Sequence, residues 1–241
     1  MTDLPKDSGK IPELETAPDG TPAIKHVYPE GQLSKGNMLN FYTKGPEGAI
    51  NLDNAKEVML TYKVWFNEDW DWVKGGKLPG MYGGTDPASA KGCSGGDQRE
   101  DCFSARVMWR KDGDGELYNY WPTRDQWYCS AEGPNNSKSV CDSMGESVFR
   151  GAFRFDKGRW IELTQRLRLN DVGQSNGEQE LFVDGESKIL LQNIEIRKQD
   201  DVKFQGLMAQ SFFGGSKDDF KPPKDETAFF TGFGMTVLSE F

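Results

Sequence analysis

Five side chains suited to moving a proton beside a carboxylate lie within the stretch from residue 75 to residue 120, namely Lys77, Ser104, Arg106, Tyr118 and Tyr120. An arginine offers a planar fork that matches a carboxylate. A carboxylate neutralised in this way makes the C–H bond next to it easier to deprotonate. Lysine and tyrosine have ordinary pKa values near ~10, so the pKa of one of them must be shifted if it is to act as a base near neutral pH.

Period-two alternation places four of these side chains on common faces of two predicted strands. In the segment FSARVMWR, Ser104 and Arg106 lie on one face and the apolar side chains lie on the other. In the segment ELYNYW, Tyr118 and Tyr120 share a face in the same way. The two segments predict a β-hairpin whose apolar face is turned to the core.

The length of the hairpin loop decides whether the four side chains meet. A three-residue loop at 112–114 pairs Arg106 with Tyr120 and keeps all four on one face, whereas a two-residue turn splits them across the sheet. We expect the three-residue loop. Lys77 lies in GGKLPGMYGG, residues 75–84, which we interpret as a glycine-rich loop beside the hairpin.

Alternating, β-rich segments recur along the rest of the chain, and hardly any stretch has helical periodicity. We predict one all-β domain at 26–241, a jelly-roll sandwich of two antiparallel sheets. An extended N-terminal arm precedes it at 1–25, and 122–147 forms a long disulfide-tied loop. Besides the hairpin, strands are predicted at 27–42, 57–67, 147–155, 160–170, 178–183, 188–197, 203–213 and 228–238.

The composition excludes some classes of partner. A formal net charge of -9 disfavours nucleic acid, because neutralising phosphates requires clustered lysine and arginine. No apolar run approaches the ~20 residues that span a membrane. Residues 1–25 are polar and contain no leader segment, which fits either a cytosolic protein or a mature secreted domain. We expect a monomer.

The four cysteines favour the second of these. Cys93 and Cys102 are close in sequence, as are Cys129 and Cys141, and each pair encloses a polar loop. Of the three possible pairings we favour these two disulfides over free thiols or a zinc site, because no CxxC occurs and the single histidine is remote. Together with a glycosylation sequon at 135–137, the disulfides predict a secreted, extracellular protein.

Several of these segments together resemble the alginate and glucuronan lyases of polysaccharide lyase family fourteen. They are GGKLPGMYGG, the cysteine-bracketed segment CSGG…CFSAR, RVMWR and YNY. The close match covers about a fifth of the chain, and SFFGG at 211–215 agrees as well. Its specific part is the spacing from Lys77 to Ser104 and from Arg106 to Tyr118.

The resemblance implies a jelly roll whose concave groove binds an anionic polysaccharide. The substrate is a 4-linked polyuronide, cleaved by β-elimination to leave a 4,5-unsaturated uronate. In this family pattern Arg106 and Ser104 hold the uronate carboxylate, Lys77 takes the proton from C5, and Tyr118 or Tyr120 protonates the leaving O4, with base and acid interchangeable. No cofactor is required, although the many loop aspartates leave room for a structural calcium ion.

The loop 122–147 and the second cysteine pair lie outside the matching motifs, so they could alter the groove and its specificity. Aromatic rings can stack on sugars, and polar or charged side chains can add contacts along the polymer. On these grounds the predicted substrate-binding set is Tyr82, Gln98, Arg99, Trp121, Arg124 and Phe213.

Two other functions fit the same residues less well. A non-catalytic carbohydrate-binding module would keep the aromatic residues and Arg106 but would not need Lys77 beside two tyrosines. A glycoside hydrolase needs two carboxylates flanking a groove, and Glu116 has no obvious acidic partner. Only elimination creates a conjugated double bond, so the ultraviolet absorbance of the products separates the three functions.

Overall fold

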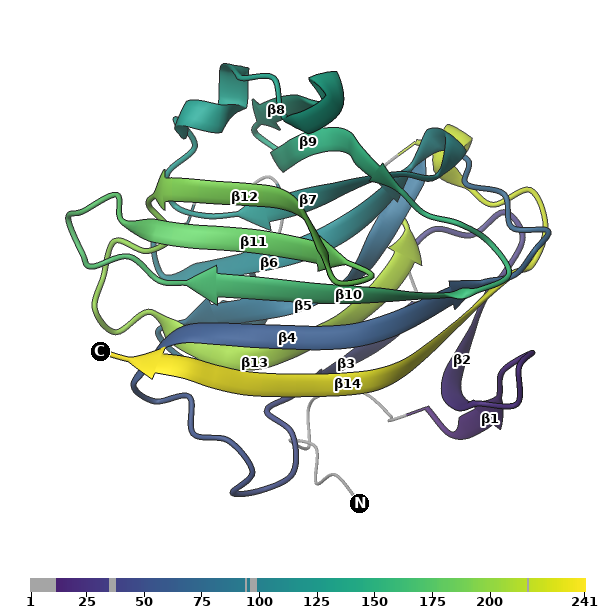
Figure 1. Cartoon of the computed structure of the whole chain (residues 1–241), viewed down its shortest axis with the longest axis horizontal. Helices are drawn as coiled ribbons and strands as arrows, with labels where there is room; N and C mark the ends of the chain where they lie inside the picture. Colours follow the sequence, from purple (N-terminus) through teal and green to yellow (C-terminus); the bar gives the residue numbers. More distant parts are fainter. Residues whose placement is uncertain (1–11, 35–37, 94, 96–98, 216) are drawn as a thin grey trace.

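Two antiparallel sheets of seven strands each lie face to face (Figure 1). The computed structural model describes residues 12–34, 38–93, 95, 99–215 and 217–241. Sheet A has the order β1 (Leu14–Thr16), β2 (Pro22–Tyr28), β14 (Glu226–Glu240), β4 (Ala55–Phe66), β10 (Trp160–Arg168), β11 (Gly177–Val183) and β12 (Glu186–Ile194). Sheet B has the order β3 (Leu39–Thr43), β13 (Lys203–Phe213), β5 (Gly75–Gly84), β6 (Cys102–Arg110), β7 (Asp114–Tyr120), β9 (Gly145–Arg154) and β8 (Lys138–Asp142).

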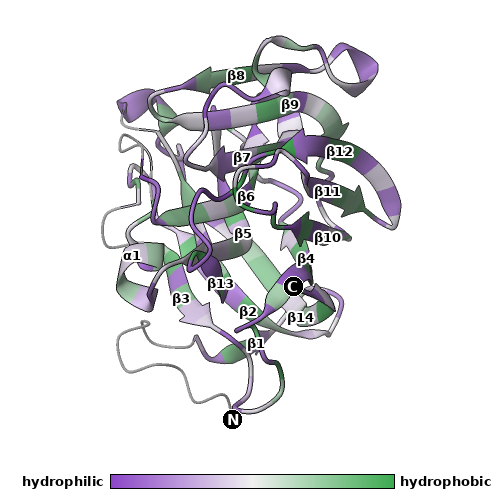
Figure 2. Cartoon of the chain, turned by 90° about the vertical axis from the view of Figure 1, so that its left-hand side faces the viewer, coloured by the Kyte–Doolittle hydropathy of each residue, from purple (hydrophilic) through white to green (hydrophobic). Residues whose placement is uncertain are grey.

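The helical elements are short and lie in the connections. They are α1 (Pro87–Lys91) and the 3-10 turns η1 (Lys111–Gly113), η2 (Trp127–Ser130), η3 (Pro134–Asn136) and η4 (Asp218–Phe220). Helix α1 lies on the side of sheet B that faces away from sheet A (Figure 2). We call this side the open face of sheet B. The predicted jelly-roll sandwich of two antiparallel sheets is thereby confirmed.

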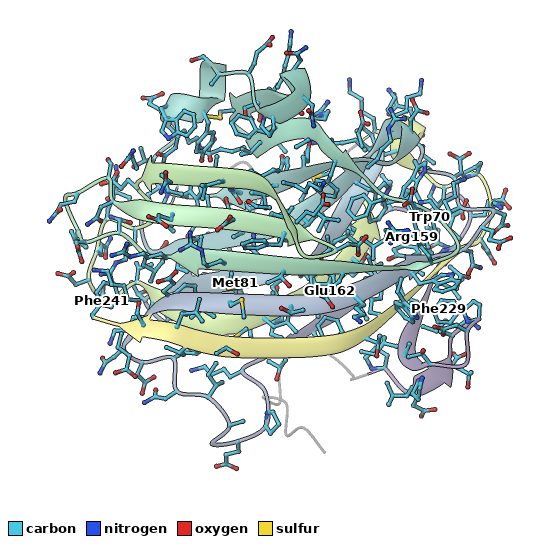
Figure 3. The ribbon with its side chains drawn as sticks, viewed as in Figure 1. Trp70, Met81, Arg159, Glu162, Phe229 and Phe241 are labelled. Carbon is cyan, nitrogen blue, oxygen red and sulfur yellow. A yellow bond between two sulfur atoms is a disulfide. The ribbon has the colours of Figure 1, made fainter. Side chains whose placement is uncertain are left out.

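The core lies between the sheets because the strands alternate as predicted. Strands β4 and β10 bury every second residue, and the hydropathy colouring shows apolar bands alternating with polar ones along the strands (Figure 2). Met81 is fully buried in the middle of the sandwich, and Trp70 fills one end (Figure 3). There Trp70 packs against the rings of Tyr28, Trp109 and Phe213.

The β6–β7 hairpin confirms the predicted faces but not the predicted pairing. Arg106 lies opposite Tyr118, and Ser104 lies opposite Tyr120. The loop has three residues, as expected, but it is Lys111–Gly113, one position earlier than predicted. Asp112 and Gly113 both have positive φ, at 61° and 82°, which closes the turn early and leaves Asp114 to begin β7. The pairing changes by two positions in total, so the shared face is preserved.

Three other segments are more regular than the sequence suggested. Residues 75–84, interpreted as a loop, form β5 in the middle of sheet B. The predicted loop 122–147 contains η2, η3, β8 and the start of β9. Residues 14–16 and 22–25 of the predicted arm are paired strands at the edge of sheet A.

Both predicted disulfides are present. Cys93 is bonded to Cys102, and Cys129 is bonded to Cys141. The first bond joins the segment after α1 to the start of β6, and the second joins η2 to β8. Among the described residues, no helix has the length and apolar character that crossing a membrane requires.

Candidate active site

A β-bulge in β5 brings the lysine of the predicted set onto the open face. Gly80 pairs with Arg106, and Lys77 pairs with Met108, so three steps along β5 match two steps along β6. Pro79 lies inside this irregular segment, where a central strand tolerates a residue without an N–H. A regular strand would turn Lys77 toward the core when Gly80 faces outward, because side chains alternate. The bulge reverses that alternation, and Lys77 joins the open face.

Lys77 is surrounded by aromatic rings and cations. Its Nζ lies 4.5 Å from the centre of the Tyr118 ring, 5.9 Å from that of Tyr120 and 5.4 Å from that of Phe212. Desolvation, reinforced by the positive charges of Arg106 and Arg110, holds the pKa of Lys77 well below the ordinary value of 10.5. This environment favours the neutral amine, which is the form that can accept a proton.

Arg106 and Ser104 lie deeper than Lys77. Arg106 is 3% exposed and Ser104 is completely buried. The Arg106 guanidinium lies 5.1 Å from the centre of the Tyr120 ring, and its Nη1 donates to Oε1 of Gln210 at 3.2 Å. Two of their polar atoms, Nε of Arg106 and Oγ of Ser104, are buried without a hydrogen-bond partner. Arg106 therefore supplies positive charge next to the Tyr120 ring.

The two tyrosines are packed edge to face and fixed by a turn of the chain. Their ring centres are 5.4 Å apart. The Tyr118 hydroxyl donates to the carbonyl oxygen of Met144 at 3.0 Å, and burial raises its pKa above the ordinary value of 10.0. Tyr118 is therefore protonated at neutral pH. Gly145 has a φ of 132°, and a Cβ there would come within 2.7 Å of the Tyr120 ring and 2.8 Å of the Tyr118 ring.

A cleft of about 1060 Å³ opens over Lys77, Tyr118 and Tyr120. We call it the basic cleft, because basic residues outnumber acidic ones in its lining. The basic residues that line it are Lys74, Lys77, Arg110, Arg150, Lys217 and Lys221, and the acidic residues are Asp142 and Asp219. Met108, Met144 and Phe212 contribute apolar surface. An acidic protein thus presents a positively charged groove around the candidate base.

The predicted substrate-binding residues that the structure describes do not line this cleft. Trp121 is 3% exposed and donates its indole N–H to Tyr128, and Phe213 is 1% exposed in the aromatic core. Their neighbours in sequence alternate to the other face, so Phe212 rather than Phe213 reaches the cleft. Tyr82 is on the open face but is buried against Tyr42.

The remaining members of that predicted set are polar. Arg99 forms an ion pair with Asp101, with 2.6 Å between Nη2 and Oδ2. Arg124 donates to the backbone oxygen of Asp142 at 3.0 Å. Gln98 lies outside the described residues. None of the described ones is part of the cleft lining.

Two arginines that line the cleft were not predicted from the sequence. Arg110 ends β6 on the face it shares with Arg106, so the alternation could have identified it. Arg150 could not be found in this way, because β9 is irregular between the residues that pair with Gly115 and Leu117. Phe149 has a φ of 50° there and packs into the core, while Arg150 lines the cleft. This second bulge again turns a cation outward.

Glu116, the only acidic residue that the sequence placed beside the tyrosines, is not available as a catalytic acid. It is completely buried and accepts hydrogen bonds from Arg110, Arg150 and Ser147. For metals, the described residues bring together one group of potential ligands, Cys129, Cys141 and Glu146. Its two sulfurs form a disulfide and offer no thiolate.

Comparison with known proteins assigns the family. The family model described as Polysaccharide lyase 14 matches residues 16–233. The chain belongs to this family. It is therefore a polysaccharide lyase, and the resemblance seen in the sequence motifs is confirmed. Among curated proteins, none matches the chain.

Solved structures agree with the assignment. The chain is similar to the marine PL-14 alginate lyase from Aplysia kurodai, at 30% identity and a TM-score of 0.81, over 93% of this chain and 86% of that one. Alginate lyase vAL-1 from a Chlorella virus has 22% identity and a TM-score of 0.71, over 94% and 89%. The endo-β-1,4-glucuronan lyase of the fungus Trichoderma reesei has 11% identity and a TM-score of 0.58, over 97% and 90%. The last two support the fold.

Proposed function

We propose that this lyase cleaves a 4-linked polyuronide, with alginate as the first candidate, by β-elimination. The observation that carries the proposal is the position of Lys77, an amine of lowered pKa beside two tyrosines at the floor of the basic cleft. A polyanion suits a cleft lined by cations, which also disfavours a neutral glycan. Alginate is favoured over glucuronan because the relative at 30% identity is an alginate lyase.

In the proposed reaction the enzyme takes one proton from the substrate and gives one proton back to it. The neutral amine of Lys77 takes the proton from C5 of the bound uronate. The electron pair of that C–H bond forms the C4–C5 double bond, and the bond from C4 to the bridging O4 breaks. Tyr120 gives its phenolic proton to O4, so the products are an unsaturated uronate and a free 4-hydroxyl. Positive charge from Arg106 stabilises the negative charge that develops during the transfer.

The tyrosine roles follow from their contacts. The Tyr118 hydroxyl donates to the Met144 carbonyl, and its raised pKa opposes ionisation. Tyr118 therefore stays neutral, and its ring stabilises the ammonium that Lys77 becomes after it takes the proton, through a cation–π interaction. Tyr120 lies next to Arg106, whose charge would stabilise a transient phenolate. Because Arg106 supplies positive charge next to Tyr120, we propose that the elimination needs no metal cofactor.

The assay is absorbance at the unsaturated-uronate band with alginate and with glucuronan. We expect wild type to generate the chromophore, Lys77→Ala and Tyr120→Phe to lose activity by a factor of ~10² or more, and EDTA to leave the rate unchanged. Full activity of Lys77→Ala would refute the assignment of the base. Binding without any chromophore on either polymer would leave a carbohydrate-binding protein instead.

We further propose that the protein is secreted, because it contains two disulfides, which persist in oxidising compartments. Expression with and without an oxidising compartment, followed by a thiol count, tests this. Loss of the folded protein only under reducing conditions is the expected result. A stable, active enzyme with four free thiols in a reducing cytosol would contradict the proposal.

A further inference from the structure

The chain holds an arginine pair beside the candidate base. Glu116 on β7 lies between Arg110 on β6 and Arg150 on β9. Its Oε1 accepts from Arg110 Nε at 2.8 Å, and its Oε2 accepts from Arg150 Nε at 2.9 Å and from Ser147 Oγ at 2.7 Å. One buried carboxylate thus fixes two guanidinium groups, and the cluster carries a net charge of +1.

Each of the two arginines has guanidinium N–H groups that remain available to a ligand. Within the described part of the chain, the Nη1 groups of Arg110 and Arg150 donate to no protein acceptor. Both residues line the basic cleft, and the Arg150 side chain is 43% exposed. A buried ion pair made only for stability would gain little over apolar packing. Here two partly accessible cations are instead held rigidly at a groove, which lowers the entropic cost of binding an anion.

The backbone supports the same conclusion. The β9 bulge, with Phe149 at positive φ, is what turns Arg150 toward the cleft. Positive φ at a bulky residue costs free energy and persists where the surrounding structure imposes it, often at functional sites. The strain therefore places a cation where regular alternation would have put an apolar ring.

The pair is close to the reacting position but separate from it. Lys77 pairs with Met108, and Met108 pairs with Glu116, so Lys77 and Glu116 lie in one cross-strand row, two strands apart. That spacing is roughly 10 Å. An extended polymer that presents one carboxylate to the lysine side of the cleft would present another to the arginines.

We propose that Arg110 and Arg150 form a second carboxylate-binding subsite, which holds another uronate residue of the same polymer close to the one that is cleaved. This proposal rests on the proposed polyuronide substrate. The planar fork of arginine fits the two oxygens of a carboxylate, and Glu116 sets its orientation. The subsite selects for polymers that carry several carboxylates along the chain. Arg150 acts there on binding rather than on the chemical step, whereas Arg110 also lowers the pKa of Lys77.

Binding is best measured without turnover, by calorimetry in the Lys77→Ala background with an alginate tetrasaccharide and a glucuronan tetrasaccharide. We expect Arg150→Met to weaken the affinity for the preferred ligand roughly 10- to 100-fold, as the loss of charge-assisted hydrogen bonds does. Arg150→Lys should recover only part of it, because a lysine lacks the fork. Arg154→Met is the matched control, since Arg154 also lies on β9 but pairs with Asp114 away from the cleft. It should bind like the parent.

Kinetics in the active enzyme provide the second readout. Arg150→Met should raise KM by a similar factor and leave kcat within about twofold, whereas distortion of the catalytic residues would lower kcat. Unchanged affinity in Arg150→Met, or an equal loss in Arg154→Met, would overturn the proposal, as would a kcat defect with an unaltered KM. The test is independent of the elimination itself. If no chromophore forms on any uronan yet affinity still depends on Arg150, the subsite stands and the lyase substrate does not.

Discussion

Removing the charge of Arg110 should move the pH profile of the enzyme toward alkaline pH. Lys77 must be neutral to accept a proton, so kcat/KM should rise with pH, about tenfold per unit, until it levels off above the pKa of Lys77 in the free enzyme. Arg110 lowers that pKa. The substitution Arg110→Met keeps an unbranched side chain, removes the positive charge and leaves Glu116 with Arg150 as its partner.

The size of the shift follows from two contacts. Lys77 Nζ is 4.5 Å from the Tyr118 ring centre, and the Arg110 guanidinium carbon is 5.7 Å from it, so the two charges are at most about 10 Å apart. Two like charges at ~10 Å repel by about 1.7 kcal/mol at an effective dielectric constant of 20 and by about 0.4 kcal/mol in water. These limits correspond to roughly 0.3–1.2 pKa units. Glu116 raises the pKa of Lys77. In Arg110→Met the charge of Glu116 is compensated by one arginine instead of two, so Glu116 should raise the pKa of Lys77 further.

The experiment compares kcat/KM from pH 5 to pH 10 for wild type, Arg110→Met and the distant control Arg154→Met. We expect the midpoint of the acidic limb to rise by about half a unit to one unit in Arg110→Met alone. A lower plateau from weaker binding does not move the midpoint. An unchanged midpoint, or a shift to lower pH, would refute the assignment of that limb to Lys77.

Three further predictions concern the frame of the site. Gly145→Ala should reduce kcat at least ~10-fold, because a Cβ there would collide with the rings of Tyr118 and Tyr120. Gly185→Ala is the control, since Gly185 also has positive φ but has open space around it, and this variant should keep full kcat at some cost in stability. Replacing Cys129 and Cys141 together by serine should lower stability by about 3 kcal/mol, seen as a fall in melting temperature of roughly 5–10 °C, and an unchanged melting temperature would contradict a native disulfide there. Burial raises the pKa of Glu146 to about 8, so the folded state retains a proton that the unfolded chain releases near pH 4.5, and stability should decline as the pH rises from 4.5 through 8. Denaturant titrations should show this slope flattened in Glu146→Gln, and equal slopes in both proteins would rule out the buried neutral carboxyl.

Alternation predicts the β6–β7 hairpin because its two faces differ sharply in polarity. It places Ser104, Arg106, Tyr118 and Tyr120 on one face, and the structure agrees. The predicted pairing differs from the observed one by two positions because it depends on which loop residues take positive φ. Asp and Gly can both do so, and the segment 112–115 contains two of each.

Strand β5 was missed because its glycines suggest a loop when they are considered alone. In the sandwich they are required by close packing. A Cβ at Gly76 would lie 2.1 Å from the Trp109 ring, and one at Gly83 would lie 2.3 Å from the Phe103 ring. Large rings on β6 occupy the space that side chains on β5 would need. Such complementarity between strands is invisible in either strand's own sequence.

β-Bulges explain the other differences between the predicted and the observed site. Lys77 and Arg150 reach the cleft through single irregularities that reverse the alternation, so no period-two argument places them. Aromatic residue type does not predict which side chains line the cleft for a related reason. Phe212 and Phe213 are chemically alike, and only their phase along β13 sends one to the cleft and the other to the core.

The clustering of basic residues at the cleft in a chain of net charge -9 has a consequence for how substrate arrives and products leave. At a distance an anionic polymer meets a repulsive surface, and attraction begins only within a Debye length of the groove, about 8–10 Å in ordinary buffers. Added salt should therefore weaken the repulsion that the approaching polymer meets, and it should also weaken the attraction within the groove. Because these effects oppose each other, we expect the rate to pass through an optimum in ionic strength rather than to fall steadily. A cleaved fragment that slips out of the groove is pushed away, so the same charge layout clears products.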